Sequence, residues 1–505
     1  MPATIESRSP ASGELLGAVE AAPAAAVQAA AARAGVAQPL WANVPAAARA
    51  RYVRRAARVV LDELDAVALL LARETGRPRT EAVLGEILPS VAGLQALADD
   101  GPRALADRRL GRPALLRGGR RAVGVQQPRG VIGVLGGSAS PWTEPVLEVA
   151  AALLAGNAVV VVPAAPLAGE QLRAIFLRAG IPEDLLAVAH GEEAGSALPA
   201  SCARVVSVAA PPAKGAMLVL EGAPVEPVTA AALWAAFAAG GRHPAAVSRL
   251  VCAGSAAEPL VAELGDRARR LRVGDPTREE AEVGPLRSHE DLALVGRLVA
   301  EAVAGGAELV CGGPTAVPGL SGAFYAPTVL RRVPAGARIL REPAPGPVLS
   351  VVEAATEAEA IELVQRGSGP PEAVLTIDHE DETSPSRERR ARGSVVSVWA
   401  RDRPKGERVA RTLGAELAWV NEHGVVAPGP ALRLARHVAP RQVASRPARL
   451  GGARRLPYDP ALVRARTAAA RLAHGREADR LAVLRRDAAP LARAAIRMAV
   501  GLVRR

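Results

Sequence analysis

The chain of 505 residues is long enough to bury a large core and to divide into two or three domains. Half of its residues are hydrophobic, which favours a globular protein, and its three cysteines, Cys202, Cys252 and Cys311, lack the spacing of a zinc site or a disulfide framework. The first residues lack the charged-then-apolar pattern of a signal peptide, so we expect a cytoplasmic protein.

The positive charge of the chain is concentrated at its C-terminal end. The net charge is +12, and residues 433–505 contain eighteen arginines and four acidic residues, a local net charge of +14. The preceding 432 residues are therefore close to neutral, at about −2. The basicity belongs to a C-terminal segment and not to the body of the chain.

Strands and helices alternate along the first half of the chain. Apolar residues at spacings of three and four predict an amphipathic helix over residues 47–72. Short apolar segments predict buried strands at 130–135, 158–162, 186–189, 204–208 and 217–220. Between them we expect one helix that ends near residue 154 and another over residues 169–179. This alternation predicts a doubly wound α/β sheet.

A second α/β region follows, and then the character of the sequence changes. We expect helices at 229–239 and 292–304 and strands at 248–252 and 308–311. From about residue 451 the chain becomes rich in alanine and arginine with few large apolar residues, which predicts a basic helical tail over 451–505.

Seven stretches of the chain are informative together: Trp41–Pro78 (ending ETGRP), Pro128–Val134 (PRGVIGV), Ala152–Asn157 (ALLAGN), Arg270–Pro285, Gly322–Leu330 (GAFYAPTVL), Glu342–Val348 (EPAPGPV) and Trp419–Asn421 (WVN). In their order and approximate spacing, they resemble the aldehyde dehydrogenase superfamily. The resemblance implies an α/β fold with a Rossmann-type nucleotide-binding domain, an α/β catalytic domain and a β-hairpin used for oligomerisation. The expected domains are 1–115 with 130–225 for nucleotide binding, 116–129 with 433–445 for oligomerisation, and 226–432 for the catalytic-type domain.

The resemblance also implies a position for the catalytic cysteine, and this chain has proline there. The family pattern FxNxGQxCxxxxR aligns without gaps to residues 237–249, which places the cysteine position at Pro244. A thiolate is the nucleophile of the family's reaction, so this chain is identified as a divergent member that lacks it.

The groups that would hold the oxyanion are missing as well. The family uses the backbone N–H of the cysteine and an asparagine side chain, but proline has no N–H and the asparagine position aligns with Ala139. Loss of a single such donor commonly raises the barrier by about 2.7–4 kcal/mol. The family's general base aligns near Glu221, which could substitute partly, although Val219 could instead hold that position.

The cofactor site implied by the resemblance, for NAD or NADP, is also altered. The family's ribose-binding lysine aligns with Val162, and its GSTxxG turn reads Ala210–Gly215, where Lys214 and Gly215 remain as weak candidates. The second ribose-binding glutamate aligns with Pro343, next to Glu342. Binding of NAD(P) by this chain is therefore in doubt.

Other residues could replace the nucleophile or the base. Cys252 and Cys311 lie in apolar segments typical of buried structural thiols, and His243 lies beside the altered position without an evident partner in the sequence.

Three hypotheses follow. The leading one is a catalytically impaired pseudoenzyme that acts as a structural or regulatory subunit, in a homo-oligomer or with an aldehyde dehydrogenase-like relative, and for which a small-molecule substrate is doubtful. The second is an active NAD(P)-dependent oxidoreductase with displaced catalytic groups. The third, less favoured because the tail lacks aromatic residues beyond Tyr458, makes the tail a tether to nucleic acid or a membrane.

Overall fold

The structure is a computed structural model, and the chain forms two compact units. The first unit combines Met1–Ala104 with Pro128–Val438, and the second combines Leu105–Gln127 with Ala439–Arg505. The residues that the structure describes are 3–109, 121–208, 215–243, 245–367, 373–378, 388–391, 395–415, 417–424 and 430–445. The tail expected over 451–505 lies outside the described residues.

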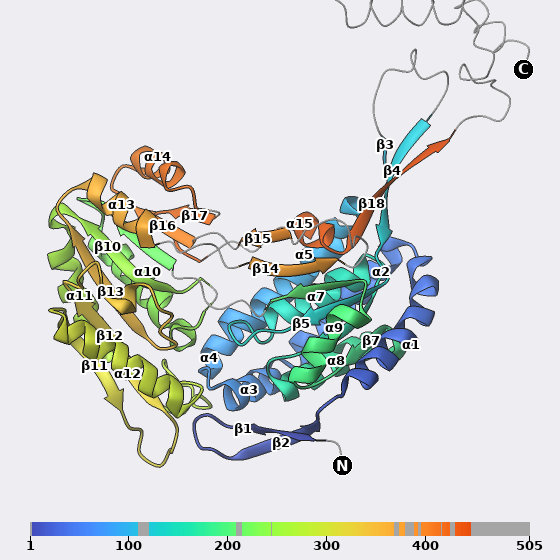
Figure 1. Cartoon of the computed structure of the whole chain (residues 1–505), viewed down its shortest axis with the longest axis horizontal. Coiled ribbons are helices and arrows are strands. Elements are labelled where there is room, and N and C mark those ends of the chain that lie inside the picture. Colours follow the sequence, from blue (N-terminus) through green and yellow to red (C-terminus); the bar gives the residue numbers. More distant parts are fainter. Residues whose placement is uncertain are drawn as a thin grey trace, which may run out of the picture. The chain divides into compact units, whose positions relative to one another are not determined.

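The first unit contains a six-stranded sheet in the order β15-β14-β8-β5-β6-β7 (Figure 1). Strands β8, β5, β6 and β7 run parallel, whereas β14 pairs antiparallel with β8 and with β15. The bounds are β5 Val131–Leu135, β6 Ala158–Val162, β7 Leu186–Val188, β8 Arg204–Ser207, β14 Ala373–Asp378 and β15 Glu388–Ala391. Strand β6 reads AVVVV and is buried throughout, as expected for a central parallel strand covered on both faces.

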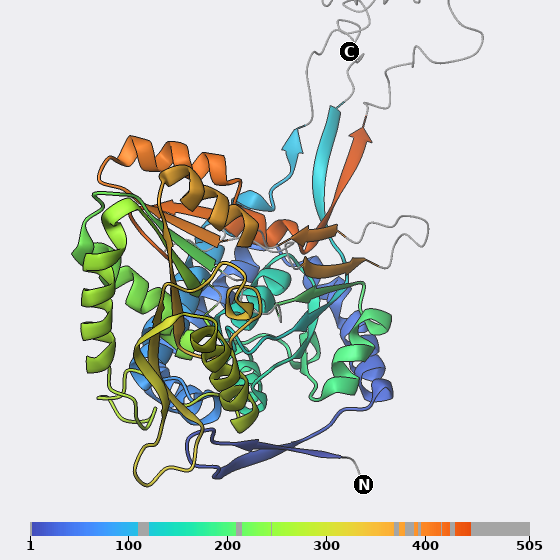
Figure 2. The same cartoon turned by 60° about the vertical axis from the view of Figure 1, so that its left-hand side comes forward.

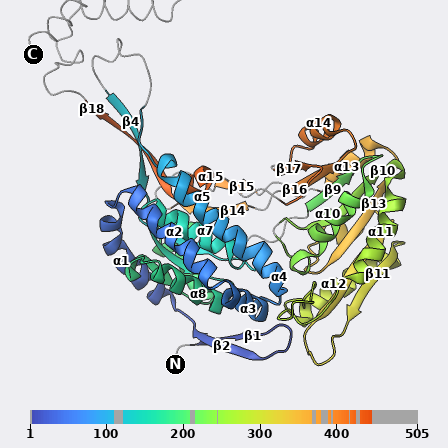
Figure 3. The same ribbon diagram turned by 180° about the vertical axis from the view of Figure 1, so that it is seen from behind.

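Helices cover both faces of this sheet, which confirms the predicted doubly wound α/β architecture. Helices α1 (Ala24–Ala42) and α9 (Glu192–Ser201) pack on one face, and α7 (Thr143–Leu154) and α8 (Pro166–Arg178) on the other. Behind α7 lie α2 (Ala46–Asp62) and α5 (Leu88–Ala104), side by side (Figure 3). Because α7 is enclosed between the sheet and this outer layer, all its residues except Glu144 are buried.

The helix expected over residues 47–72 is two helices, α2 and α3 (Leu64–Thr75), joined at Glu63. Glu63 has φ −109° and ψ 15°, outside the helical region, and its carboxylate contacts Arg178 and Gln171 of α8. The apolar spacing continues across the joint, so the periodicity alone could not locate it.

A continuous helical stretch then runs from Arg79 to Ala104. It comprises α4 (Arg79–Glu81), a π-helical segment η1 (Ala82–Ile87) and α5. Among the described residues it is the one helix long and apolar enough to cross a membrane by length and composition, and 44% of its most apolar window is buried in the protein. Core helices of soluble proteins pass the same test.

A second, seven-stranded sheet has the order β11-β12-β13-β10-β9-β16-β17. All neighbouring strands are parallel except the antiparallel pair β11 and β12. The bounds are β9 Gly215–Val219, β10 Val247–Ala253, β11 Glu308–Thr315, β12 Phe324–Arg331, β13 Val348–Ala354, β16 Val395–Trp399 and β17 Leu417–Val420. Helices α10 (Val225–Phe237) and α11 (Ala257–Arg270) cover one face, and α12 (His289–Ala304), α13 (Glu357–Gly367) and α14 (Arg403–Leu413) cover the other.

The strand pairing differs in two places from the expected domain ranges. Strand β9 falls in the range 130–225 but belongs to the seven-stranded sheet, while β14 and β15 fall in 226–432 but extend the six-stranded sheet. Both faces of β9 are apolar: Met217 contributes to the core under α10, and Leu218 to the core under α12. Strand β9 pairs with β10 along one edge and with β16 along the other, so it is a central strand of the sheet. Central parallel strands are typically apolar on both faces.

Two smaller elements complete the described chain. Strands β1 (Thr4–Arg8) and β2 (Leu15–Glu20) form an antiparallel hairpin in the first unit. The second unit is described by a three-stranded sheet in the order β18-β4-β3, whose strands lie side by side in Figure 2. The strands are β3 Arg108–Arg109, β4 Arg121–Pro128 and β18 Val438–Ser445, and α15 (Pro430–Ala435) precedes the last. The domain ranges themselves stay a prediction.

Candidate active site

The loop after α10 has an unusual backbone. Within η3 (Ala238–Gly241), Ala239, Gly240 and Gly241 have φ values of 54°, 60° and 78°. Glycine adopts this left-handed region freely, whereas alanine pays about 1–2 kcal/mol for it. A Cβ on Gly241 would lie 2.2 Å from the carbonyl oxygen of Gly346, so the path of the loop requires glycine there. Pro244, at the expected cysteine position, lies outside the described residues.

Of the two residues before that position, Arg242 is buried and His243 partly buried, and both form hydrogen bonds within the loop. The Arg242 side chain donates through Nε to the carbonyl of Ala239 at 2.9 Å, and burial lowers its pKa to about 10. His243 Nδ1 accepts the N–H of Ala245 at 3.1 Å. Burial, with smaller contributions from Arg77 and His423, lowers the His243 pKa to about 3, so the imidazole is neutral. His243 therefore has the partner that the sequence did not reveal.

An aromatic cluster adjoins this loop. Trp234 meets His243 edge-on with ring centroids 4.9 Å apart, and Trp419 lies 4.9 Å from His423. His423 Nε2 lies 2.8 Å from the carbonyl oxygen of Ala245, so Nε2 must carry the proton. Burial lowers the pKa of His423 as well, and both neutral imidazoles form hydrogen bonds with the backbone of Ala245.

Glu86, in the π-helical segment, is paired with Arg77 and also contacts the start of α7. Arg77, 2% exposed, contacts Glu86 at 2.9 Å, and Glu86 also accepts the N–H of Thr143 at 2.8 Å and the hydroxyl of Ser140 at 3.1 Å. Glu86 thus caps the N-terminus of α7, where a carboxylate is favourable. The Arg77 guanidinium also donates to the carbonyl of Ala139.

Ala139, expected at the family's asparagine position, is buried and engaged through its backbone alone. Its methyl side chain offers no hydrogen-bond donor. Its role in the site stays a prediction.

Glu81 is a second carboxylate near Arg77, and it also has a backbone hydrogen bond at Ala239. Its Oε1 atom is buried without a hydrogen bond, 3.9 Å from Arg77 Nη1, which is paired with Glu86 instead. Burial raises the Glu81 pKa to about 7 although Arg77 and Arg242 act in the opposite direction. The sequence analysis missed this residue, because nothing in the helical pattern distinguishes it from a solvated glutamate.

The three cysteines share a buried environment. All three are free and buried, on α9's C-terminal end, β10 and β11. Burial raises the pKa of Cys202 and of Cys252 to about 12, with Glu353 adding to the shift at Cys252, and it raises the pKa of Cys311. The expectation that Cys252 and Cys311 are structural agrees with this environment.

Glu221 lies at the other end of β9 from the altered loop. Gly215 pairs with Val247 at the start of β10, close in sequence to the loop, whereas Glu221 follows the C-terminal end of β9. Six residues of strand span about 20 Å. The Glu221 carboxylate is exposed and accepts the hydroxyl of Ser255 at 2.8 Å, and Val219 is buried in the core. The use of Glu221 as general base stays a prediction, and its position at the far end of β9 does not favour it.

The weak cofactor candidates are engaged elsewhere or not described. Gly215 begins β9, where a Cβ would lie 2.3 Å from the carbonyl oxygen of Ala246, so close strand packing explains the glycine. Glu342 forms a two-pronged pair with Arg338, with both contacts at 2.7 Å. Lys214 lies outside the described residues.

Carboxylates occupy the helix N-termini at the carboxyl edge of the six-stranded sheet. Helix N-termini at this edge are the usual phosphate sites of nucleotide-binding folds. Glu86 caps α7, and Glu74 accepts the N–H groups of Leu167 and Ala168 in the first turn of α8, each at 2.8 Å. The first turn of α9 contains Glu192 and Glu193.

The end of β6 is closed as well. Val162, at the expected lysine position, is 5% exposed, and its carbonyl accepts the N–H of Gly136 at 2.8 Å. A Cβ on Gly136 would lie 3.0 Å from the backbone nitrogen of Ala164, so the two loops are in close contact. At the starts of α7 and α8, carboxylates therefore occupy amide groups that a pyrophosphate would use, and the first turn of α9 carries two acidic residues.

Comparisons with known proteins agree with the fold. Residues 1–210 and 205–368 match the model described as the aldehyde dehydrogenase family. Betaine aldehyde dehydrogenase of Cereibacter sphaeroides is 27% identical over 442 residues, covering 82% of this chain and 85% of that protein.

Two solved structures share the fold. The NAD+ complex of an aldehyde dehydrogenase from Bacillus cereus has a TM-score of 0.76 and 21% identity, covering 88% of this chain and 93% of that one. An NAD-dependent benzaldehyde dehydrogenase from Corynebacterium glutamicum has a TM-score of 0.75 and 21% identity, covering 88% and 95%.

Proposed function

Because this chain belongs to the aldehyde dehydrogenase family, we propose that it is a catalytically impaired member that acts as a structural or regulatory subunit. The observation that carries the proposal is the state of its cysteines. The whole sequence contains three, and all are buried thiols with raised pKa values, while proline aligns with the nucleophile. A thiol held in its protonated form inside a core cannot attack an aldehyde.

The surroundings of the altered loop support the same proposal. His243 and His423 are neutral and committed to the backbone around Ala245, so neither is poised as a base. Ala139 has no side-chain donor for an oxyanion. No described residue favours the alternative of an active oxidoreductase with displaced groups.

NAD(P) does not fit the described part of the cofactor region. Family members bind NAD or NADP, which would supply the hydride acceptor of the family reaction. In this chain Glu86 and Glu74 accept backbone amides at the starts of α7 and α8, and two acids lie in the first turn of α9, so these helix starts are poorly suited to the phosphates of a dinucleotide. We therefore propose that binding of NAD(P) is weak or absent.

The subunit role rests on the contrast between this altered site and an intact framework. The two α/β sheets and the three-stranded sheet of β18, β4 and β3 are formed. We propose that the chain assembles with itself or with an active relative, that it is cytoplasmic, and that its basic tail is not a tether to nucleic acid or membrane.

Calorimetric titration of the folded, full-length chain with NAD+ and with NADP+ tests the cofactor part. We expect no heat of binding at concentrations where an active family member, used as the positive control, saturates. Micromolar binding of either nucleotide would overturn this part of the proposal.

Native mass spectrometry tests the subunit part. Mixing the chain with a mass-tagged active relative is expected to give homo-oligomers or mixed oligomers. A strictly monomeric chain at micromolar concentration would contradict the subunit role.

A further inference from the structure

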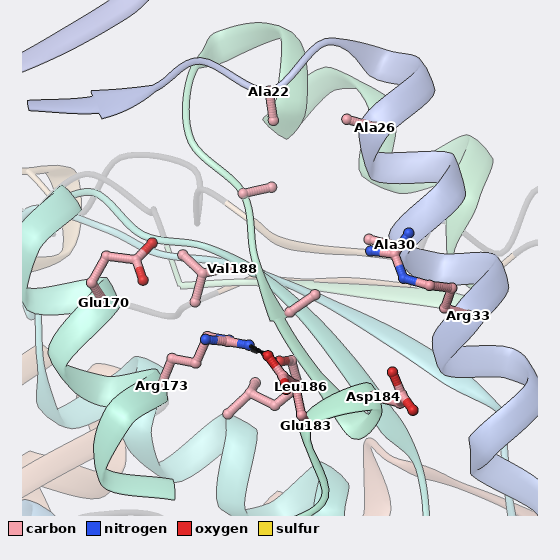
Figure 4. Close-up of a pocket in the computed structure, with 12 residues that line it drawn as sticks. Ala22, Ala26, Ala30, Arg33, Glu170, Arg173, Glu183, Asp184, Leu186 and Val188 are labelled. Atoms are coloured by element: carbon pink, nitrogen blue, oxygen red, sulfur yellow. Dashed lines mark hydrogen bonds and ion pairs between the residues drawn. The ribbon is translucent and has the colours of Figure 1, made fainter. Parts of the chain in front are cut away.

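A recess of about 420 Å³ follows the edge strand β7 (Figure 4). Strand β7 ends the six-stranded sheet and pairs on one side only, with β6. Helix α1 forms one wall of the recess, α8 forms the opposite wall, and η2 (Glu183–Leu185) closes its lower end in Figure 4. The recess lies at the edge of the six-stranded sheet, whereas the loop around residue 243 leads into β10 of the seven-stranded sheet, so the recess belongs to neither the expected catalytic site nor the expected cofactor site.

Main-chain groups of β7 face this recess. In the parallel ladder Val160 pairs with Ala187, and the N–H of Ala189 donates to the carbonyl of Val161 at 3.0 Å. Alternate residues of a parallel strand bond to opposite sides, so the N–H and C=O groups of Leu186 and Val188 point away from β6. Arg173 Nε reaches the carbonyl of Leu186 at 3.4 Å, which leaves Val188 as the more open position.

Small side chains keep this edge accessible. Ala22 precedes α1, and Ala26 and Ala30 follow at intervals of four residues on the same face of the helix, opposite Val188 (Figure 4). Beyond them Arg33 continues that face. A larger residue at Ala30 would fill the space beside the strand.

The charges around the recess favour a basic occupant. Its lining includes three carboxylates, from Glu170, Glu183 and Asp184, against two guanidiniums, from Arg33 and Arg173. Arg173 is paired with Glu183 at 2.5 Å, so these two charges neutralise each other. Of the remaining acids, Glu170 contacts His190 Nε2 at 2.7 Å and lies on the α8 side, whereas Asp184 lies on the α1 side (Figure 4).

We propose that this recess binds an extended peptide segment of a partner protein, which adds a strand to β7 and carries arginine or lysine between small residues. Its main chain pairs with Val188, its small side chains face the alanines of α1, and its basic side chain meets Asp184. Strand addition to an exposed edge is a known mode of peptide recognition, with main-chain bonds giving affinity and side pockets giving selectivity. This inference is independent of the proposed subunit role.

A second copy of this chain is the less suitable occupant. The edge is recessed between α1 and α8, so the β7 edge of another copy would be kept away by its own flanking helices. A single extended segment is narrow enough to enter.

The test uses a fluorescein-labelled peptide of alternating alanine and arginine, titrated into the full-length chain and followed by fluorescence anisotropy. Ala30→Leu is expected to weaken binding at least about tenfold by filling the recess. Ala32→Leu is the matched control, because Ala32 is an exposed residue of α1 that does not line the recess. Its affinity should stay within about twofold of the wild type. Equal binding by the wild type and Ala30→Leu would overturn the proposal.

Two further measurements identify the occupant. Asp184→Lys should weaken the arginine peptide and strengthen a matched alanine–glutamate peptide; an unchanged preference would refute the charge argument. Hydrogen exchange at the Val188 amide should slow when the arginine peptide binds. Protection of that amide that instead rises with protein concentration, without peptide, would identify a second copy as the occupant and overturn the proposal.

Discussion

Replacement of Glu81 by glutamine should stabilise the protein at alkaline pH and have little effect in acid. The Glu81 pKa is raised from 4.5 to about 7 by burial, so the folded state prefers the protonated form. A carboxyl with a raised folded pKa costs nothing below its unfolded pKa, and its ionisation destabilises the fold as the pH rises through the folded value. Between pH 5 and pH 8 this penalty grows by about 2.5 kcal/mol.

Urea unfolding of the wild type and of Glu81→Gln at both pH values measures that difference. Glutamine keeps the shape of the side chain and cannot ionise, so the variant should be more stable than the wild type by about 3 kcal/mol at pH 8 and by less than about 1 kcal/mol at pH 5. The matched control is Glu86→Gln, five residues along the same helical stretch. Because Glu86 is the close partner of Arg77 and the cap of α7, this variant should lose about 3–5 kcal/mol at both pH values. A pH-independent effect of Glu81→Gln, or a loss of stability at pH 8, would refute the reasoning.

Three more outcomes follow from particular contacts. Ala239→Gly should raise the free energy of unfolding by about 0.5–1 kcal/mol by removing the strain at φ 54°, whereas Ala238→Gly, at φ −57°, should lower it; thermal melts of both variants would contradict this if they shifted in the same direction. Glu148→Gln should cost about 3–5 kcal/mol in urea unfolding because it leaves Arg433 and Arg436 without their buried partner, and Glu144→Gln, which spares Glu148, should cost clearly less. Burial alone would raise the Glu148 pKa, but Arg433, His437 and Arg436 hold it at about 2, so this contribution should be present above pH 4.5 and fade as the pH falls toward 2. The three thiols should react with a thiol reagent at pH 8 at least about a hundredfold more slowly in the native protein than in urea, and a single fast native thiol would contradict their burial.

Much of the fold could be predicted from local patterns. The strand at 158–162 was expected with the bounds that the structure gives, because an uninterrupted run of valines after a Gly-Asn turn suits a central parallel strand. The helix predicted at 229–239 begins four residues earlier in the structure, at Val225. Pro224 directly precedes its first turn, a position where proline is well tolerated. The assignment of β9 to a sheet could not be made, because a strand that is apolar on both faces fits either sheet by sequence alone.

The site was less accessible to sequence reasoning. Alignment with the family motifs assigns Pro244 to the cysteine position and Ala139 to the asparagine position. It could not show that Glu74 and Glu86 occupy helix N-termini, because their hydrogen-bond partners lie 93 and 57 residues away in the sequence. Glu81 and His423 acquire their neighbours only through tertiary contacts with the loop around Ala239 and Ala245. Only Glu192 and Glu193, in the first turn of α9, could have been recognised in the sequence as acidic residues at a helix start, and that signal is too common to interpret.

The most direct test of an impaired family member is a turnover assay. The purified, folded, full-length chain would be incubated with NAD+ or NADP+ and a panel of aliphatic and aromatic aldehydes, and NAD(P)H would be followed by absorbance, with an active family member as the positive control. No aldehyde-dependent NAD(P)H above the rate without protein is the predicted result. Steady turnover that scales with the concentration of this chain would contradict the proposed loss of catalysis.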